Sequence, residues 1–399
     1  MKVLMINSVC GIRSTGRICT DLAVALEAEG HEVKIAYGRE NVPGQFHKYA
    51  VRIGTDFGVK LHGVKARLMD ADGLGSRHAT KKFVKWIEAY DPDIIHLHNL
   101  HGYYINVPVL FKYIILHKKK VVWTLHDCWT FTGHSGTCDI VKCEKWLSGC
   151  GKCPLSKGYP KSYIDRSKRN LKWKKQLFSL VGDITIVTPS NWLAGLVKRS
   201  FFKDKAVEVI PNGIDITQFM PFKNDFRKVY GIEDKILLLG CASAWGKEKG
   251  LNDFITLSQR LDNRFVIVLV GLTKEQISDI PQDIICIERT QSVKELNQIY
   301  SSADLFLNLT YVDVYSMVNR EALLSGTPVL TYDTGGCAEC INEHNGISFK
   351  TGDLEGVLEF LVKFFKTDMF DLLPGNINDP ISREVATQKY EKIIAREVL

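Results

Sequence analysis

Two successive series of short apolar runs, separated by helix-length segments, constrain the fold of this 399-residue chain more than any other feature. The first series of β-like runs lies at Lys2–Asn7, His31–Tyr37, Asp93–His98, Val121–His126 and Ile184–Thr188. Parallel strands need crossover connections of about this length. The pattern therefore predicts an α/β domain with a parallel, doubly wound sheet.

The second series starts after a turn-forming segment, Pro211-Asn212-Gly213-Ile214-Asp215. Its runs lie at Ile236–Ala242, Phe265–Val270, Ile284–Ile287, Leu305–Leu309 and Val329–Thr331, with helical patterns at Leu251–Leu261, Val293–Ser302 and Arg320–Ser325. We expect two Rossmann-like domains, 1–210 and 211–380, facing a central ligand cleft, and a C-terminal helix in 381–399 that packs back on the first domain.

Composition indicates a globular protein with an anionic partner. Hydrophobic residues make up 45% and charged residues 24%, both close to average, and the formal net charge is +7. The start has no signal-peptide pattern, and polar residues and proline interrupt the longest apolar stretch, Tyr103–Leu116, which predicts a cytoplasmic protein. Residues 157–175 contain eight basic residues and one acid, which fits either a solvated helix face or a surface that touches anionic phospholipid.

A glycine-containing loop, Gly11 to Ile18, follows the first predicted strand and opens the first helix. It is nearly a Walker A loop, but Arg17 and Ile18 replace the required Lys and Ser or Thr, so ATP hydrolysis is not expected. The glycine spacing also differs from the dinucleotide-binding fingerprint. Because a helix start favours anions, we favour a ligand contact over a bare structural turn.

The segment from Asp313 to Pro328, D-V-Y-S-M-V-N-R-E-A-L-L-S-G-T-P, follows an apolar strand. If the helix begins near Met317 or Val318, Asp313 lies in the loop before it and Glu321 in its first turns. Both carboxylates can then face one pocket and bind sugar or ribose hydroxyls, while the helix start offers N–H groups to a diphosphate. The segment predicts a nucleotide-sugar site. The alternative is that Asp313 is an ordinary loop acid and Glu321 an ordinary surface residue of the helix.

These residues resemble the large retaining glycosyltransferase family 4, which has the two-domain GT-B fold. The family pattern E-x7-E, then A-x-x-x-G-x-P, has counterparts in Asp313, Glu321, Ala322, Gly326 and Pro328, followed by the G-G-x-x-E pattern at 335–339. Further matches are T-x-H-D at 124–127, P-S at 189–190, P-N-G-I-D at 211–215 and K-G at 249–250. They span nearly the whole chain in the family's order. The segments 98–104 and 126–129 resemble bacterial enzymes that build capsule, lipopolysaccharide or exopolysaccharide.

The resemblance implies a role for each matching residue. Glu321 would hold the ribose hydroxyls, Asp313 the hydroxyls of the transferred sugar, and Lys249 the leaving phosphate. Members of the family usually have an Arg a few residues before this Lys, but this chain has Ser243 near that place. Lys247 is then the only other cation near the phosphate. The diphosphate would bind the backbone of the residues that open the helix, which are Met317, Val318 and Asn319.

His126 ends a predicted strand, where a family histidine lies close to the reacting carbon, so we assign it a positioning role. The family has no consistent protein nucleophile, and no catalytic base or catalytic metal is expected. We expect Gly16 to contact the donor, and His98, His101 and Arg13 to contact the acceptor, although structural roles for the histidines are equally consistent with the sequence.

Five cysteines lie between positions 128 and 153. In a reducing cytosol such density predicts a structural zinc site formed by Cys138, Cys143, Cys150 and Cys153, with unliganded packing cysteines or a redox pair as the alternatives.

The sequence therefore predicts a retaining hexosyltransferase that moves sugar from a UDP- or GDP-linked donor to a glycan or polyprenyl-linked acceptor. Because such acceptors lie at the inner face of the plasma membrane, a peripheral contact with anionic membrane is expected through 157–175 or Lys112–Lys120. A sugar-nucleotide epimerase of the same fold is one alternative. The other alternative is a zinc-finger-like nucleic-acid-binding protein. The favoured function, sugar transfer, involves no nucleic-acid partner.

Overall fold

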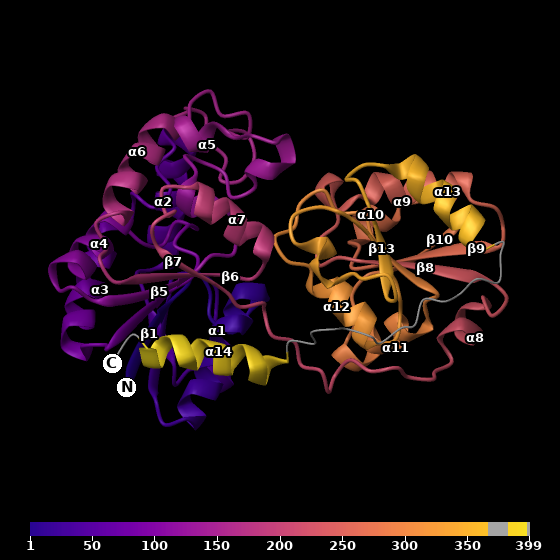
Figure 1. Cartoon of the computed structure of the whole chain (residues 1–399), viewed down its shortest axis with the longest axis horizontal. Coiled ribbons are helices and arrows are strands. Elements are labelled where there is room, and N and C mark those ends of the chain that lie inside the picture. Colours follow the sequence, from indigo (N-terminus) through magenta and orange to yellow (C-terminus); the bar gives the residue numbers. More distant parts are fainter. Residues whose placement is uncertain (366–381, 397–399) are drawn as a thin grey trace. The chain divides into compact units, whose positions relative to one another are not determined.

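The computed structural model describes residues 1–365 and 382–396, which form two compact units (Figure 1). The first unit comprises Met1–Gly213 together with the chain from Arg383 onward, and the second comprises Ile214–Ser382. The last part of the second predicted domain, 366–380, and the end of the predicted C-terminal helix, 397–399, lie outside the described residues.

The first unit contains a seven-stranded parallel sheet in the order β3-β2-β1-β4-β5-β6-β7. The strands are β1 (Lys2–Ile6), β2 (Glu32–Tyr37), β3 (Ala50–Arg52), β4 (Ile94–Leu97), β5 (Lys120–Thr124), β6 (Ile184–Thr188) and β7 (Ala206–Val209). The helices are α1 (Arg13–Ala28), α2 (Asp56–Met69), α3 (Arg77–Tyr90), α4 (Val107–Leu116), α5 (Lys145–Ser148), α6 (Ser167–Phe178), α7 (Asn191–Arg199) and α14 (Arg383–Arg396). Short 3₁₀ helices lie at η1 (Gly44–Phe46), η2 (Trp129–Phe131) and η3 (Cys138–Val141).

The central strands of this sheet are apolar throughout because both of their faces are covered. All residues of β4 and β6 are buried, as is typical of parallel sheets between two helix layers. Helix α14 joins the same unit, where Tyr390 and Ile394 are buried and Arg383 pairs with Asp21 of α1 at 3.2 Å.

The second unit contains a six-stranded parallel sheet in the order β10-β9-β8-β11-β12-β13. The strands are β8 (Ile236–Cys241), β9 (Phe265–Val270), β10 (Ile284–Ile287), β11 (Leu305–Asn308), β12 (Val329–Tyr332) and β13 (Gly346–Phe349). The helices are α8 (Phe226–Tyr230), α9 (Leu251–Arg260), α10 (Lys274–Ile277), α11 (Val293–Ser302), α12 (Met317–Leu324) and α13 (Leu354–Phe364), with 3₁₀ helices η4 (Lys247–Lys249) and η5 (Cys337–Cys340).

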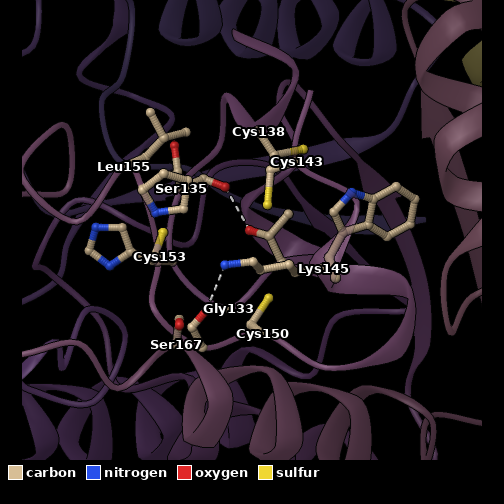
Figure 2. A pocket seen from close by; sticks show the side chains of 14 residues that line it. Gly133, Ser135, Cys138, Cys143, Lys145, Cys150, Cys153, Leu155 and Ser167 are labelled. Carbon is tan, nitrogen blue, oxygen red and sulfur yellow. Dashed lines mark hydrogen bonds between the residues drawn. The ribbon is translucent and has the colours of Figure 1, made fainter. Parts of the chain in front are cut away.

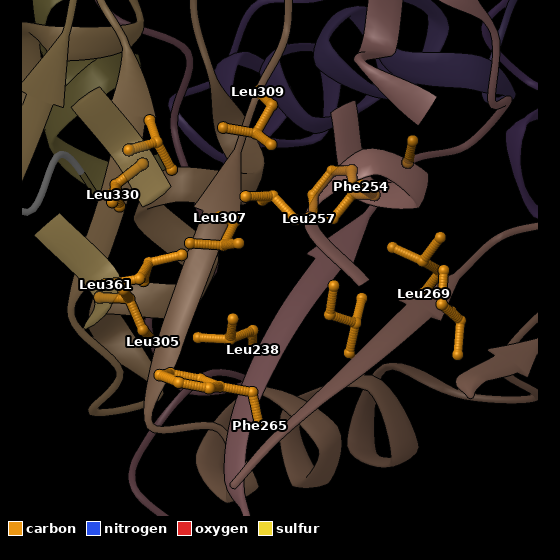
Figure 3. Close-up of a cluster of buried hydrophobic side chains, with 14 of the residues drawn as sticks. Leu238, Phe254, Leu257, Phe265, Leu269, Leu305, Leu307, Leu309, Leu330 and Leu361 are labelled. Carbon is orange, nitrogen blue, oxygen red and sulfur yellow. The ribbon is translucent and has the colours of Figure 1, made fainter. Parts of the chain in front are cut away.

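Leucine-rich strands and the helices that cover them form the core of this unit. Figure 3 shows side chains of β8, β9, β11 and β12 packed with those of α9 and α13. Leu238, Leu257 and Leu361 are fully buried there. This packing fixes the strand ends from which the site loops leave.

The structure confirms the predicted fold class of two doubly wound α/β domains. Three strands were missed, namely β3, β7 and β13, and each lies at the edge of its sheet. An edge strand is covered less completely, and β7 alternates between exposed and half-buried positions instead of forming an apolar run. Within the described residues, no helix has both the length and the apolar character needed to span a bilayer.

Strand order reverses once in each sheet, and these two points locate the candidate sites. The reversal lies between β1 and β4 in the first unit and between β8 and β11 in the second. Loops that leave neighbouring strands there turn to opposite faces, and ligands bind in the crevice that results.

Candidate functional site

The switch point of the second unit brings Lys249 and Asp313 together, although they are far apart in sequence. Lys249 lies in η4 after β8, and Asp313 lies in the loop after β11. Lys249 Nζ lies 3.1 Å from Asp313 Oδ2 and also donates to the Val312 carbonyl at 3.4 Å. Both side chains are partly exposed, so a ligand can reach them.

Two glycines with left-handed backbone allow these loops to approach so closely. Gly250 has φ +72°, and a Cβ there would lie 2.2 Å from the Leu309 carbonyl oxygen. Gly335 has φ +57°, and a Cβ there would lie 1.7 Å from the carbonyl oxygen of Asp313. Only glycine combines this backbone with so short an approach, so both residues position the acid and the lysine.

Helix α12 begins at Met317, one of the two starts considered from the sequence and three residues before the predicted helical pattern Arg320–Ser325, and its start is tightly held. The hydroxyl of Ser316 caps the helix by accepting from the Asn319 N–H at 3.3 Å. Asn308, at the end of β11, donates to Ser316 Oγ and to Asn319 Oδ1 at 3.0 and 2.7 Å. Since the cap takes the N–H of Asn319, the N–H groups of Met317 and Val318 are the better placed to meet a diphosphate.

Glu321 lies one turn into α12 and is half-buried. Its Oε2 accepts a hydrogen bond from the Tyr300 hydroxyl of α11 at 3.0 Å. Burial raises the pKa of the nearby Cys241 thiol to about 12, and the negative charge of Glu321 adds to this effect. The carboxylate is thus oriented by a buried tyrosine in the manner expected of a hydroxyl-binding group.

Lys247, Gly16 and Arg13 occupy less defined surroundings. Lys247 is exposed at the start of η4. Gly16 lies inside α1, because the helix already begins at Arg13, and its carbonyl accepts from the Gly11 N–H at 3.0 Å. Arg13 has φ +56° and pairs with Glu40 at 2.7 Å on the surface. Their assignments as ligand contacts stay predictions.

Three histidines gather where β4 and β5 of the first unit end. His98 Nδ1 and His126 Nε2 lie 3.0 Å apart, and the rings of His96 and His98 are 4.2 Å apart. Burial lowers the pKa of His126 to about 4 and that of His96 to about 3, and it lowers the pKa of His98 well below its usual range. All three rings are therefore neutral near pH 7.

The burial of His98 changes the role that it can fill. Its exposure is 2%, and one ring nitrogen faces His126. The position suits a residue that orients His126 better than one that contacts an acceptor directly. His126, which is only half-buried, is the member of the pair closer to solvent.

His101 forms a second histidine site with Asp127. Its Nε2 lies 2.8 Å from Asp127 Oδ2. Burial disfavours the charged form of His101, but the attraction and hydrogen bond of Asp127 outweigh it and raise the pKa of His101 above its usual value. The contact with Asp127 therefore orients the imidazole of His101, which is one of the predicted acceptor contacts.

The four cysteines of the predicted zinc site line one small cavity of about 30 Å³ (Figure 2). Among the described residues, however, no group of three or more His, Cys, Asp or Glu side chains is arranged to hold a metal ion. Burial also raises the pKa of Cys150, and it raises that of Cys153 to about 11. The structure does not support the zinc prediction, and the cysteines instead line a cavity.

Several supporting residues were not predicted. Tyr300 and Asn308 orient the α12 site, and Tyr390 of α14 bonds to Thr124 Oγ1 at 3.0 Å, which in turn meets His96 Nε2 at 2.8 Å. Asn308 could have been singled out from the sequence, because it is a polar residue at the end of an apolar strand. Tyr300 and Tyr390 had none, since they come from helices distant in sequence.

Fold and site together define a two-domain glycosyltransferase of the GT-B type. Residues 15–218 match the family model Glycosyltransferase Family 4, and residues 222–368 match Glycosyl transferases group 1. The chain belongs to glycosyltransferase family 4. This membership decides for a transferase against the epimerase and nucleic-acid alternatives, and it agrees with the expectation that no catalytic metal is needed.

One similar protein is WcaC of Escherichia coli (strain K12), whose name refers to a glycosyl transferase of colanic acid biosynthesis. It is 25% identical to this chain, over 94% of this chain and 93% of its own length. A GDP-mannose-dependent alpha-mannosyltransferase of Mycobacterium tuberculosis (strain CDC 1551 / Oshkosh) is 23% identical, over 83% of this chain and 78% of its own. The structure of HepE from Anabaena in complex with UDP matches with a TM-score of 0.70 at 15% identity, covering 99% of this chain and 100% of HepE.

Proposed function

We propose that this glycosyltransferase moves a hexose from a UDP- or GDP-linked donor, with retention of the anomeric configuration, to a glycan or polyprenyl-linked acceptor in surface polysaccharide synthesis. The observation that carries the proposal is the cluster of Lys249, Asp313, the start of α12 and Glu321 at one switch point. The names of the relatives, which refer to colanic acid and to GDP-mannose, support the donor class and the pathway type.

Each part of the cluster matches one part of a nucleotide sugar. The Glu321 carboxylate accepts from two ribose hydroxyls, while the N–H groups of Met317 and Val318 bind the diphosphate with the help of the helix dipole. Asp313 accepts from hydroxyls of the sugar. Arrival of the diphosphate draws Lys249 from Asp313 toward the phosphate oxygens, and this frees the carboxylate for the sugar.

The reaction follows from this arrangement. An acceptor hydroxyl oxygen forms a bond to the anomeric carbon while the bond from that carbon to the diphosphate oxygen breaks. The proton of the hydroxyl passes to the departing phosphate. Lys249 stabilises the negative charge that grows on the phosphate, and preorganised charges of this kind supply much of an enzyme's rate enhancement. His126, held by His98, contributes positioning rather than proton transfer, because it is neutral and weakly basic.

We further propose that the protein works at the inner face of the plasma membrane. The overall charge of +7 and the basic residues of 157–175 support contact with anionic lipid. Lys174 does not take part in it. Its side chain is buried and donates to the carbonyls of Trp129 and Thr132 at 2.6 and 3.1 Å.

Proton NMR of the reaction tests the proposed chemistry. The purified protein is incubated with α-linked UDP- and GDP-hexoses and a membrane lipid extract. We expect acceptor-dependent release of nucleotide and a product whose anomeric coupling is still that of an α-linkage. A β-linked product would disprove retention. Release of nucleotide that does not depend on the lipid extract would contradict the proposed acceptor class.

A further inference from the structure

Helix α2 carries an apolar stripe that faces solvent. Phe57, Leu61, Val64 and Leu68 follow each other at helical spacing, with exposures of 70, 56, 55 and 52%. The opposite side of the helix is buried through His62 and Ala66. An apolar stripe normally faces a protein core, so an exposed one indicates a surface that another phase or molecule covers.

The buried side holds α2 firmly to the unit. His62 Nε2 accepts from the Gly75 N–H at 2.9 Å, and His62 Nδ1 lies 3.0 Å from Ser76 Oγ. Thr55 caps the helix by accepting from the Gly58 N–H at 3.2 Å. The stripe is therefore presented by a helix anchored at both its face and its start.

The basic and aromatic segment 157–175 meets the end of this helix through the loop that precedes α6. The Tyr163 N–H and the Ser162 hydroxyl both donate to the Arg67 carbonyl, at 2.8 and 3.2 Å. Tyr163 is 69% exposed, and Ile164 beside it is 48% exposed. The loop therefore extends the apolar surface of α2 beyond its last turn.

The charges around the stripe are positive. Lys60, Lys65 and Arg67 are exposed on α2, and the one acid of the helix, Asp56, pairs with Arg52. A groove of about 1170 Å³ runs between α2 and α3 and contains five Lys or Arg side chains and no acid among its lining residues. Apolar side chains flanked by cations match the layers of an anionic bilayer, with its phosphates outside and its acyl chains beneath.

We propose that the exposed stripe of α2, extended by Tyr163 and Ile164 and flanked by Lys60, Lys65 and Arg67, docks the first unit on an anionic phospholipid surface. The apolar side chains enter the boundary between headgroups and acyl chains, while the lysines and the arginine contact phosphates. The inference adds helix α2, which the sequence did not indicate, to the part of 157–175 that was already expected to touch the membrane. It can fail without the sugar-transfer proposal failing, because its test uses no donor.

Vesicle sedimentation tests the proposal with the full chain. Native protein is compared with Phe57→Ser/Leu61→Ser/Leu68→Ser and with Lys60→Gln/Lys65→Gln/Arg67→Gln. The control, Val24→Ser/Leu180→Ser, removes apolar side chains that are 48 and 64% exposed in the same unit and lie outside both predicted membrane stretches. Vesicles contain phosphatidylcholine alone or with phosphatidylglycerol. Thermal unfolding and stabilisation by UDP or GDP show whether each variant stays folded and binds nucleotide.

We expect native protein and control to bind the anionic vesicles and to bind phosphatidylcholine far less. The α2 serine variant should lose at least about tenfold in partitioning, and the glutamine variant should bind more weakly with a flatter salt dependence. Equal binding of native and serine variant, or equal binding to both lipids, would overturn the proposal. Absence of binding by native protein would also overturn it and would point to a protein partner for α2.

Discussion

At the residue scale, the account depends first on the charge of Lys249. Its ammonium is held by Asp313 and the Val312 carbonyl. If it stabilises the leaving diphosphate, Lys249→Ala should lower kcat/KM about 10²- to 10³-fold, chiefly through kcat. Steady-state kinetics measures this. The control Lys274→Ala removes an exposed lysine of the same unit and should have no effect. A Lys249→Ala variant that changes KM alone would contradict the assigned role.

The buried histidines make a second prediction at this scale. His96, His98 and His126 have folded pKa values below the ordinary 6.5, so between about pH 4 and 6.5 the unfolded chain binds more protons than the folded one. Stability must then fall as pH falls, by up to about 1.4 kcal/mol per pH unit for each missing proton. His101 acts in the opposite sense, because its raised pKa gives stability that is lost as pH rises through that value.

Replacing one of these histidines should weaken the dependence on pH. For His98→Asn we expect the loss of unfolding free energy between pH 7 and 5 to be smaller than in the native chain by about 1–2 kcal/mol. Denaturant unfolding at the two pH values measures both losses. If the loss is the same in both proteins, His98 does not stay neutral in the folded state.

At the scale of elements, the close approach of two loops in the second unit is fixed by Gly335. Alanine there meets both the left-handed backbone, about 1–2 kcal/mol, and the Asp313 carbonyl, about 1–3 kcal/mol more. The matched control is Gly231→Ala, where φ is +63° and nothing lies within 4 Å of the added Cβ. The loss of unfolding free energy should be larger for Gly335→Ala than for Gly231→Ala, and the difference should equal the cost of the contact with the Asp313 carbonyl. Equal losses would mean that the loops have room to separate.

Site residues could be predicted from the sequence where they lie in one contiguous segment, and not where they come from a separate element. The start of α12 and the positions of Asp313 and Glu321 were predictable, because one contiguous segment contains the strand end, the loop and the first turns. Tyr300 was not, since it reaches Glu321 from α11 through a contact that no local pattern encodes. His98 was expected at the acceptor because the ends of parallel strands meet at one edge of the sheet. Its burial depends on tertiary packing, which cannot be predicted from the spacing of residues in the sequence.

At the scale of the whole molecule, helix α14 belongs to the first unit, although the second unit precedes it in the sequence. Ile394 of α14 is fully buried, so Ile394→Ala should destabilise the chain by about 2–4 kcal/mol. Lys392→Ala, an exposed position on the same helix, should change it by less than about 0.5 kcal/mol. Thermal unfolding separates the two outcomes. Similar values for both variants would show that α14 contributes little to the first unit.

The central claim is that the second unit binds a nucleotide through Glu321, and calorimetric titration with UDP, GDP and ADP, alone and as sugar conjugates, tests it most directly. The native chain is compared with Glu321→Gln, which keeps the shape of the side chain but removes its charge. Glu355→Gln, which breaks a surface pair with Arg260, is the control. We predict that one nucleotide binds selectively to the native chain and the control, and that Glu321→Gln weakens it at least about tenfold. Binding that Glu321→Gln leaves unchanged, or no binding of any nucleotide to the native chain, would contradict the account.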